Sequence, residues 1–366
     1  MTDDLVLPAY DGGCITNVVP RLLHPDETQP AWLPAVAHGA ERVVLLVIDG
    51  LGWNQLEARR SLTPTINGLE GGRITTVAPS TTATALTSIS TGLPPGEHGV
   101  MGYRIAVGSE VLNVLRWGVG GKDARNHIPP ASIQDHAPFG GQRPPAVTRA
   151  EFEGSGFTLA HLDGTRFTGY RTMGTLVAEV VRLAKAGEPF VYAYYEGLDK
   201  VSHEYGLGAQ YGEELRWVDH LVAELLGALP PGTVLVVTAD HGQVETGDAQ
   251  LTLSSEILTN VAYQSGEGRF RWLHARAGRA AALAAAAASV EEHAWVVTRD
   301  QAIADGWYGP TVTPAAASRL GDVLLAAKGV WAFVDPDDTG PYVLMGRHGS
   351  LTPDEMYVPL LAGVAR

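Results

Sequence analysis

Two short apolar runs in the sequence each lead straight to an aspartate. Residues 43–48 read VVLLVI and are followed by Asp49, and residues 233–238 read TVLVVT and lead to Asp240. Unbroken apolar runs of this length are typical of parallel strands that are buried on both faces of a sheet. Open α/β sheets bind their ligands at the carboxyl ends of such strands. The two runs therefore predict an α/β fold with a functional site where these aspartates meet.

Helix and strand patterns alternate around these runs. We expect helices at residues 171–186 and 211–228, the second with a clear apolar stripe along one face. A strand at 189–195, which reads PFVYAYY, leads to Asp199, and a last strand is expected at 358–361. Alternation of this kind predicts a mostly parallel central sheet with helices packed against it.

Three segments depart from the alternation. Residues 1–40 carry many prolines and are expected to form an arm on the surface. Residues 104–155 are rich in Gly and Pro, which predicts an inserted cap of loops and short strands that covers a site. Residues 268–335 follow a strand–helix pattern of their own, with a helix expected at 315–327. This pattern predicts a small α+β lobe inserted before His348.

The composition limits the partners and the location of the protein. The 366 residues carry a formal net charge of −14, which makes a nucleic-acid polymer an unfavourable partner. A small anionic substrate can still bind where metal ions make a site locally positive. The single cysteine, Cys14, excludes an intrachain disulfide framework and favours a reducing compartment. With no signal-like start and no long apolar stretch, we expect a cytoplasmic protein without membrane contact. The oligomeric state is not predicted.

A helix is also expected shortly after Pro79. The segment from Thr81 to Ser90 begins with hydroxyl residues, continues with helix-compatible apolar residues, and is followed by Gly92. Thr81 or Thr82 would lie at the helix N-terminus, where free N–H groups and the helix dipole favour an anion such as phosphate. A hydroxyl placed there, near a carboxylate at a strand end, suggests an alkoxide activated by a metal ion.

Aspartate and histidine side chains accompany several of the strand-like elements. The candidate metal ligands are Asp49, Asp199, His203, Asp240, His241 and His348. Carboxylate oxygens and imidazole nitrogens suit a zinc-like ion where thiolates are absent. Asp199 and His203 are four residues apart and would share one face of a helical turn. Ligands in this number divide into two sets of three, which fits a site for two divalent ions.

Each of these signals also has an ordinary structural explanation. An aspartate at a strand end, such as Asp49, caps a helix about as often as it binds an ion. The Asp240-His241 pair is by itself more often a turn with a solvated histidine, and Asp199 with His203 is commonly a surface pair. Thr-rich helices usually use their hydroxyls for capping and packing. The functional interpretation depends on all of these elements occurring in one α/β chain.

In their order along the chain, the motifs resemble those of the alkaline phosphatase superfamily, and within it the type I phosphodiesterase/nucleotide pyrophosphatase family. The motifs are VVLLVIDGLG, TPTI, APSTTATALTSISTGLPPGEHG, GLDKVSHEYG, VVTADHG and GRHGSLTPDEM, and they span roughly residues 43–357. The resemblance implies an alkaline-phosphatase-like three-layer α/β sandwich over residues 1–366, with a central mostly parallel sheet and inserted cap segments. It also implies a site for two zinc ions and a Thr or Ser nucleophile at a helix N-terminus.

The resemblance assigns roles to individual residues. One ion, beside the nucleophile, would be held by Asp49, Asp240 and His241. The other ion would be held by Asp199, His203 and His348. The nucleophile matches Thr82, with Thr81 as the less favoured neighbour. It would form a phospho-threonine that water then cleaves.

The resemblance leaves the substrate contacts open. Relatives usually carry Pro-Asn two and three residues after the nucleophile, whereas this chain has Thr84 and Ala85. The basic side chains that could contact a phosphate instead are Arg104, Lys122, His127 and Lys200. Cap side chains could either stack on a flat leaving group or pack only the core of the cap, and these are Trp117, His127 and Phe139.

We therefore expect a metal-dependent hydrolase of phosphodiester or pyrophosphate bonds that acts on a small phosphate ester such as a nucleotide. Alternatives on the same two-metal site are a phosphomonoesterase and a phosphonate hydrolase. The alternative of another class is a non-catalytic metal- or ligand-binding protein. A scarcity of fixed donors near Thr82 favours a singly charged diester over a dianionic monoester.

Overall fold

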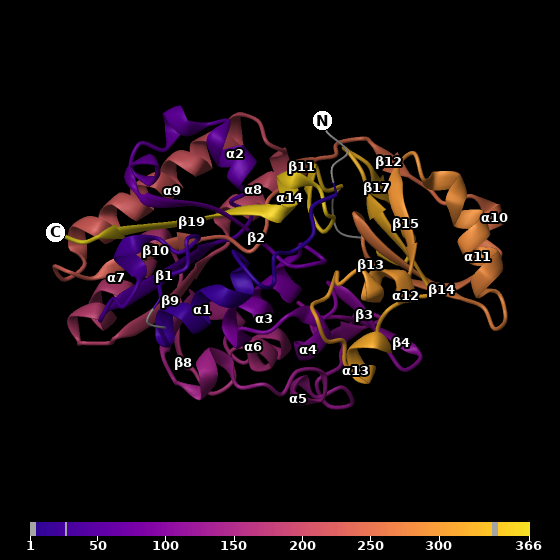
Figure 1. The fold of residues 1–366 in the computed structure, drawn as a ribbon, viewed down its shortest axis with the longest axis horizontal. Helices are drawn as coiled ribbons and strands as arrows, with labels where there is room; N and C mark the ends of the chain where they lie inside the picture. The colour runs from indigo at the N-terminus through magenta and orange to yellow at the C-terminus, as the bar shows by residue number, and fades with distance from the viewer. Residues whose placement is uncertain (1–4, 26–27, 339–342) are drawn as a thin grey trace.

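A seven-stranded sheet forms the centre of the computed structural model, which describes residues 5–25, 28–338 and 343–366 (Figure 1). The strands, in spatial order, are β2 (Glu70–Thr75), β19 (Tyr357–Val364), β10 (Val234–Thr238), β1 (Val43–Ile48), β9 (Phe190–Tyr195), β7 (Pro145–Arg149) and β8 (Arg166–Tyr170). The five strands from β10 to β8 are parallel, and β19 runs antiparallel to both of its neighbours. The predicted mostly parallel sheet is confirmed.

Strand β1 lies in the middle of this sheet and explains where the predicted acidic residues meet. All six of its residues are buried. Val43 is in register with Val234 of β10 on one side and with Phe190 of β9 on the other. Because these three strands start level and run in one direction, their carboxyl ends reach the same edge of the sheet.

Helices cover both faces of the sheet. On one face α9 (Ala209–Ala228) contacts both α7 (Met173–Lys185) and α8 (Gly197–Tyr205), and on the other face α1 (Ile15–Leu23) and α6 (Gly156–His161) contact α3 (Thr82–Thr91) (Figure 1). The result is the expected three-layer α/β arrangement.

The N-terminal segment is more buried, and packs more closely against the rest of the protein, than the sequence predicts. Helix α1 buries Ile15, Val18, Val19 and Leu22 and packs against α3. The prediction of a surface arm is therefore wrong for this part of residues 1–40. Pro20 lies inside the helix without ending it, and the apolar face decides the packing.

The predicted cap segment, residues 104–155, divides into two parts. Its first part forms a small antiparallel sheet of β3 (Arg104–Val107), β4 (Glu110–Asn113), β5 (Gly118–Val119) and β6 (Lys122–Asp123). Its last part contributes β7 to the central sheet, so the cap ends before Pro145.

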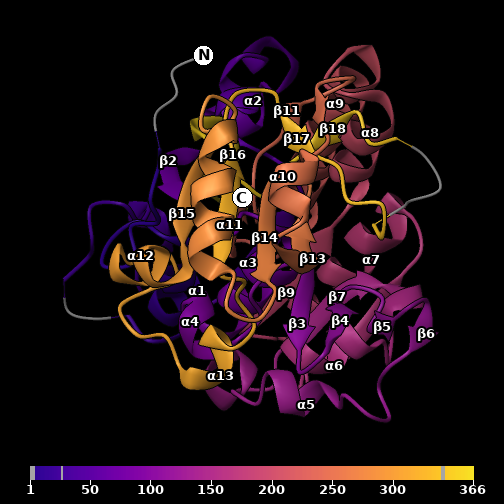
Figure 2. The same ribbon diagram turned by 90° about the vertical axis from the view of Figure 1, so that its right-hand side faces the viewer.

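A second antiparallel sheet forms the core of the lobe at the opposite end from the C-terminus (Figure 1). Its strands, in spatial order, are β13 (Val261–Glu267), β14 (Phe270–Ala275), β16 (Val323–Ala327) and β15 (Ala294–Thr298). Helix α11 (Ala280–Ala287) packs against β14, β15 and β16, and β13 lies beside β3 of the cap (Figure 2). The helix predicted at 315–327 is wrong: α13 covers Pro314–Ala317 only, and β16 occupies the end of that range.

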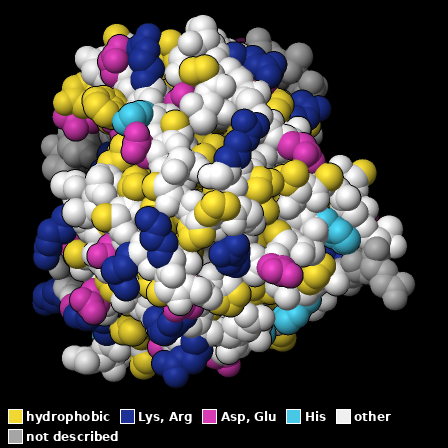
Figure 3. Space-filling view, turned by 90° about the vertical axis from the view of Figure 1, so that its left-hand side faces the viewer, with side chains coloured by type: hydrophobic (Ala, Val, Ile, Leu, Met, Phe, Trp, Pro, Cys, Tyr) yellow, Lys and Arg dark blue, Asp and Glu magenta, His cyan; other side chains and the backbone are white. Residues whose placement is uncertain are grey.

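The molecular surface carries charges of both signs. On the face at the left of Figure 1, basic and acidic side chains are interspersed with apolar ones (Figure 3). In the part of the chain that the structure describes, no helix has the length and apolar character needed to cross a bilayer.

Candidate active site

The predicted aspartates meet at the carboxyl edge of the central sheet. Asp49 directly follows β1, Asp240 lies just beyond β10, and Asp199 lies in α8, which follows β9. The Gly50 N–H donates to Asp240 Oδ1 over 3.1 Å and thereby links the first two strand ends. Gly50 has φ +72°, and a Cβ there would lie 2.7 Å from Gln243 Nε2. Glycine is therefore required at this turn.

The first predicted set of ligands converges beside Thr82. His241 Nε2 lies 3.3 Å from Asp49 Oδ1 and 3.5 Å from Asp240 Oδ2. Thr82 Oγ1 lies 3.1 Å from the same nitrogen. The ligand atoms of Asp49, Asp240 and His241 all lie within 4.8 Å of one another, which is a suitable arrangement for a metal ion.

The second predicted set surrounds Asp199. His203 Nε2 lies 3.2 Å from Asp199 Oδ2, and His348 Nε2 lies 3.8 Å from Asp199 Oδ1. The most compact group here, within 4.8 Å, contains Asp199, His348 and His241. The His241 and His348 rings stack with centroids 3.5 Å apart, whereas those of His203 and His348 are 5.2 Å apart. His241 therefore belongs to both groups, whereas His203 contacts Asp199 through the other carboxylate oxygen, Oδ2.

The backbone orients all three histidine rings in the same way. The Nδ1 atoms of His203, His241 and His348 lie 2.7, 3.0 and 3.0 Å from the carbonyl oxygens of Gly346, Gly242 and Ser80. A carbonyl oxygen can only accept, so each Nδ1 carries the proton. In the neutral rings the Nε2 lone pair then faces the site, as it does in metal-binding histidines.

The buried carboxylates of the first set fit a cation. Asp49 Oδ1 and Asp240 Oδ2 are buried and lack a hydrogen-bond partner among the described residues. Both atoms face the His241 Nε2 lone pair, so three electron-rich atoms point at one another. Burial raises the pKa of Asp49 well above its ordinary value, and Asp199 and Asp240 raise it further. A divalent ion would remove this conflict, so the residues present fit a metal.

Charge is balanced differently around Asp199. Burial acts to raise the pKa of its carboxyl, but His203 and then His348 outweigh burial and hold this pKa below its usual range. Conversely, burial acts to lower the pKa of His203, and Asp199 raises it above its ordinary value. An ion pair between Asp199 and His203 therefore offsets the cost of burying both groups.

Helix α3 delivers the hydroxyl to this cluster. Thr82 is its first residue, Thr81 is the extended N-cap without a side-chain capping bond, and Gly92 ends the helix in a left-handed conformation. Ser80, just before it, donates through Oγ to the Ser350 carbonyl over 2.6 Å, and its N–H donates to the Gly349 carbonyl. The start of the helix is thus tied to the loop that carries His348.

Two further side chains contact the candidate ligands and were not predicted. Tyr194, near the end of β9, donates a hydrogen bond to Asp49 Oδ2. Gln243, two residues after His241, donates a hydrogen bond to Asp199 Oδ1. Because Gln243 lies two residues after His241 in the sequence, the sequence alone could have indicated that it lies near the candidate ligands. Tyr194 lies in an unbroken apolar run, where the sequence does not single it out.

The basic side chains proposed for phosphate contacts are mostly engaged elsewhere. Arg104 Nη1 lies 2.6 Å from Asp335 Oδ2, which joins the cap to the lobe. Lys200 Nζ lies 2.9 Å from Glu196 Oε1. Lys122 is exposed on β6, and the exposed His127 lies 3.3 Å from Glu110. Among the described residues, none of the four forms a hydrogen bond or ion pair with the six candidate ligands.

The two large cap aromatics serve packing. Trp117 is fully buried and donates through Nε1 to the Ile128 carbonyl over 2.7 Å. Phe139 is fully buried against the rings of Phe190 and Tyr192 in β9. Of the two alternatives left open for these rings, the structure supports packing for Trp117 and Phe139, because neither ring has an exposed face.

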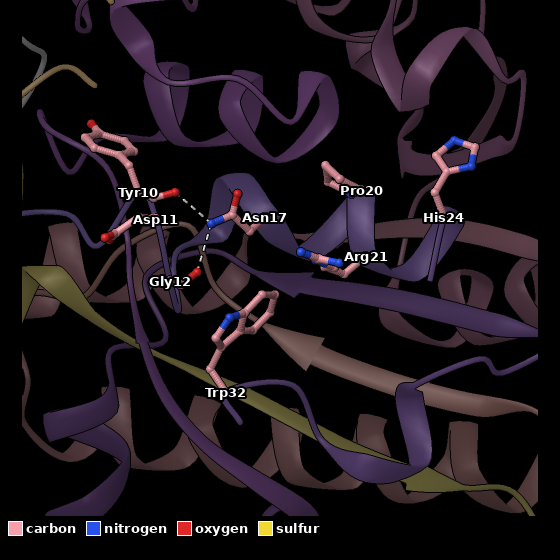
Figure 4. A pocket seen from close by; sticks show the side chains of 8 residues that line it. All are labelled: Tyr10, Asp11, Gly12, Asn17, Pro20, Arg21, His24 and Trp32. Atoms are coloured by element: carbon pink, nitrogen blue, oxygen red, sulfur yellow. Dashed lines mark hydrogen bonds between the residues drawn. The ribbon is translucent and has the colours of Figure 1, made fainter. Parts of the chain in front are cut away.

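A hollow of about 400 Å³ lies elsewhere, along α1 and the segments that flank it (Figure 4). Its wall is held by Asn17 Nδ2, which donates to the carbonyls of Tyr10 and Gly12 over 2.9 and 2.8 Å. It is lined by Tyr10, Asp11, Gly12, Asn17, Pro20, Arg21, His24 and Trp32. None of the six candidate ligands lines this hollow, so it is separate from the Asp/His cluster.

Solved structures share this fold. Murine ectonucleotide pyrophosphatase/phosphodiesterase 5 is 15% identical with a TM-score of 0.65, and the match covers 87% of each chain. An inactive variant of that protein in complex with AMP matches with 15% identity and a TM-score of 0.64, over 88% of this chain and 87% of that one. Phosphonoacetate hydrolase from Sinorhizobium meliloti 1021, in complex with phosphonoacetate, is 18% identical with a TM-score of 0.65, over 91% and 90% of the two chains.

Comparison of sequences places the chain in a family. No curated protein matches it significantly. The model of one family, described as type I phosphodiesterase / nucleotide pyrophosphatase, matches residues 43–351. This range includes all six candidate ligands and Thr82, and it covers most of the chain. The protein belongs to the type I phosphodiesterase / nucleotide pyrophosphatase family.

Proposed function

We propose that the protein is a metal-dependent hydrolase of phosphate diesters or pyrophosphates that uses Thr82 as its nucleophile. One observation carries the proposal: Thr82 Oγ1, at the N-terminus of α3, lies 3.1 Å from His241 Nε2, and His241 borders both groups of candidate ligands. A nucleophile at that point has cation-binding side chains on one side and a helix N-terminus, which favours phosphate, on the other.

The side chains have distinct roles in this proposal. Asp49, Asp240 and His241 would hold one divalent ion, and Asp199 and His348 a second, with His203 completing the second set. Ions held there would lower the pKa of the Thr82 hydroxyl and stabilise negative charge on the leaving oxygen. Zinc is the proposed metal because the donors are imidazoles and carboxylates. A cytoplasmic location stays a prediction from the composition.

The reaction would proceed in two displacements at phosphorus. In the first, Thr82 Oγ1 bonds to phosphorus as the bond to the leaving oxygen breaks, which gives a phospho-threonine; the hydroxyl proton passes to solvent. In the second, water attacks phosphorus and releases Thr82. The N–H groups of the first turn of α3 would orient the phosphoryl oxygens in both steps.

The proposed substrate class is a small, singly charged diester such as a nucleotide derivative. Arg104 and Lys200 are paired with carboxylates, so fewer cations are available to balance a dianion. The complexes of the similar structures support this size of ligand, because one contains AMP and another phosphonoacetate. The latter also makes phosphonate hydrolysis the second candidate.

A substrate panel tests the proposal. Purified protein, with zinc added, is assayed with bis-p-nitrophenyl phosphate, a nucleotide diester, p-nitrophenyl phosphate and phosphonoacetate. We expect kcat/KM to be highest for a diester. Thr82→Ala should reduce turnover by about three orders of magnitude or more while metal content stays unchanged, and Thr82→Ser should retain much of the activity.

The outcomes separate the alternatives. A clear preference for the monoester or for phosphonoacetate would replace the diesterase assignment with that activity. If Thr81→Ala is inactive and Thr82→Ala is active, Thr81 is the nucleophile. Absence of hydrolysis in the metal-loaded protein would support a non-catalytic binding protein.

A further inference from the structure

The lobe reaches the candidate active site through the tip of one β-hairpin. Strands β13 and β14 join at Gly268-Arg269, with Glu267 opposite Phe270. Arg269 is fully buried, and its Nε and Nη2 lie 2.7 and 2.8 Å from the two carboxylate oxygens of Glu355. Glu355 also accepts from the Ser350 N–H over 2.9 Å. The hairpin tip is therefore fixed against the loop that carries His348.

Glu267, the last residue of β13, lies at this hairpin tip beside the N-terminus of α3. A Cβ on Gly349, which has φ +128°, would lie 2.9 Å from Cγ and Cδ of Glu267. The Thr81 hydroxyl is also within hydrogen-bonding reach of this carboxyl. The carboxyl thus lies next to the residues that flank Thr82 and His348 in the chain.

One oxygen of the Glu267 carboxyl lacks a hydrogen-bond partner in the part of the chain that the structure describes. The Glu267 side chain is only 8% exposed, and its Oε1 has no hydrogen-bond partner among the described residues. A buried polar atom without a partner costs free energy unless a ligand or water supplies one. Its position beside Thr81 and Gly349 makes a ligand of Thr82 the natural partner.

The surroundings of Glu267 favour the protonated form of its carboxyl at neutral pH. Burial raises its pKa to about 8, while the Thr81 hydroxyl and Arg271 act to lower it, and Asp338 and Glu355 act to raise it. A protonated carboxyl donates a hydrogen bond, whereas an ionised one would repel a phosphate.

We propose that Glu267 contacts the substrate and donates a hydrogen bond to an oxygen of the phosphate ester bound at Thr82. This inference rests on the proposed function. It gives the lobe a direct part in substrate binding, and it supplies a donor to the phosphate where Arg104 and Lys200 are engaged elsewhere.

Steady-state kinetics with bis-p-nitrophenyl phosphate, from about pH 6 to pH 9.5, tests this contact. Glu267→Ala should raise KM about tenfold with a smaller change in kcat, because a ground-state contact is lost. In the wild type, kcat/KM should fall above about pH 8 as Glu267 ionises. Glu267→Gln keeps a donor that does not ionise, so it should restore KM and remove this fall. Glu256→Gln, an exposed glutamate of the lobe, is the matched control and should leave the profile unchanged.

Parallel measurements separate the two proposals. Unchanged KM in Glu267→Ala, or a wild-type alkaline fall retained in Glu267→Gln, overturns the role of Glu267. If Thr82→Ala is inactive in the same assays, the proposed function stands. If Glu267→Ala does not fold, as judged by thermal melting, the pH profile of Glu267→Gln decides alone. A wild type that hydrolyses no ester overturns the proposed function, and the role of Glu267 with it.

Discussion

His241 is the side chain at which the two groups of candidate ligands meet. Its Nε2 faces Asp49, Asp240 and Thr82, and its ring stacks on His348. Among the described candidate ligands, His348 contacts His241, Asp199 and His203, and it has no ion pair or ring contact with Asp49 or Asp240. Loss of His241 and loss of His348 should therefore reduce metal binding to different extents.

Metal content provides the prediction at the scale of the residue. We expect about two zinc ions per wild-type chain. His348→Ala should lose about one of them, and His241→Ala should lose most of both, because it borders both groups. The exposed cap residue His127 supplies the control, since His127→Ala should retain the full content. Elemental analysis of dialysed protein measures this. Full metal content in His348→Ala would remove that residue from the site.

The sequence was sufficient to predict that the candidate ligands at the strand ends come together, and it did not predict the neighbouring side chains whose positions depend on packing. Asp49, Asp240 and His241 follow apolar runs, so the rule that parallel strands end at one edge was sufficient to bring them together. Tyr194 donates to Asp49 from inside such a run, where only the strand's register reveals it. Glu267 is far from Thr81 in the sequence, and only the docking of the lobe hairpin places it there.

At the scale of the element, the β13–β14 hairpin depends on a buried ion pair. Arg269 and Glu355 are both completely buried and make two hydrogen bonds with each other. Removing one member leaves the other charged and without its partner, which typically costs about 3–5 kcal/mol. The hairpin should therefore lose this attachment to α14 (Pro353–Met356) and the loop that carries His348 when either residue is replaced.

Urea unfolding of Arg269→Ala tests this attachment. We expect a loss of about 3 kcal/mol in the free energy of unfolding. The exposed pair of Arg216 and Glu213 is the control, and Arg216→Ala should cost less than about 1 kcal/mol. Equal effects of the two substitutions would show that the buried pair does not hold the hairpin.

The elements that were wrongly predicted have local patterns that tertiary packing overrides. Residues 315–327 have helix-compatible composition, but Val323 to Ala327 lie between two strands of the lobe sheet, where their apolar side chains are completely buried. In α1 the prolines suggested an irregular arm, yet Val18 and Leu22 form an apolar face against α3. Short apolar runs fit either structure, and only the partner surface decides between them.

At the scale of the whole molecule, three buried histidines outside the site make stability depend on pH. Burial lowers the pKa of His98 to about 3 and those of His161 and His274 to about 4. In the unfolded chain these groups titrate near about 6.5. Between these values the unfolded chain binds more protons than the folded one. Their contribution to stability is therefore complete above about pH 6.5 and is lost as the pH falls towards 4.

Unfolding measured between about pH 4.5 and pH 7.5 checks this dependence. Each such histidine adds up to about 1.4 kcal/mol per pH unit to the slope, so His161→Phe should reduce the slope by about that amount. His220, which is exposed, is the control, because His220→Gln removes a group that is solvated in both states. A slope that His161→Phe leaves unchanged would contradict a neutral buried His161.

Strands β11 (Val244–Glu245) and β18 (Gly346–Arg347) pair with each other and bracket the lobe. The chain leaves the main domain and returns to it at neighbouring positions. The lobe is therefore an insertion that leaves the central sheet uninterrupted. In evolutionary terms, such an insertion can be exchanged by recombination without moving Thr82 or the strand ends. Because its hairpin tip lies beside the start of α3, each exchange would bring a different side chain to the candidate active site. Different lobes would then surround the same Asp/His cluster with different side chains.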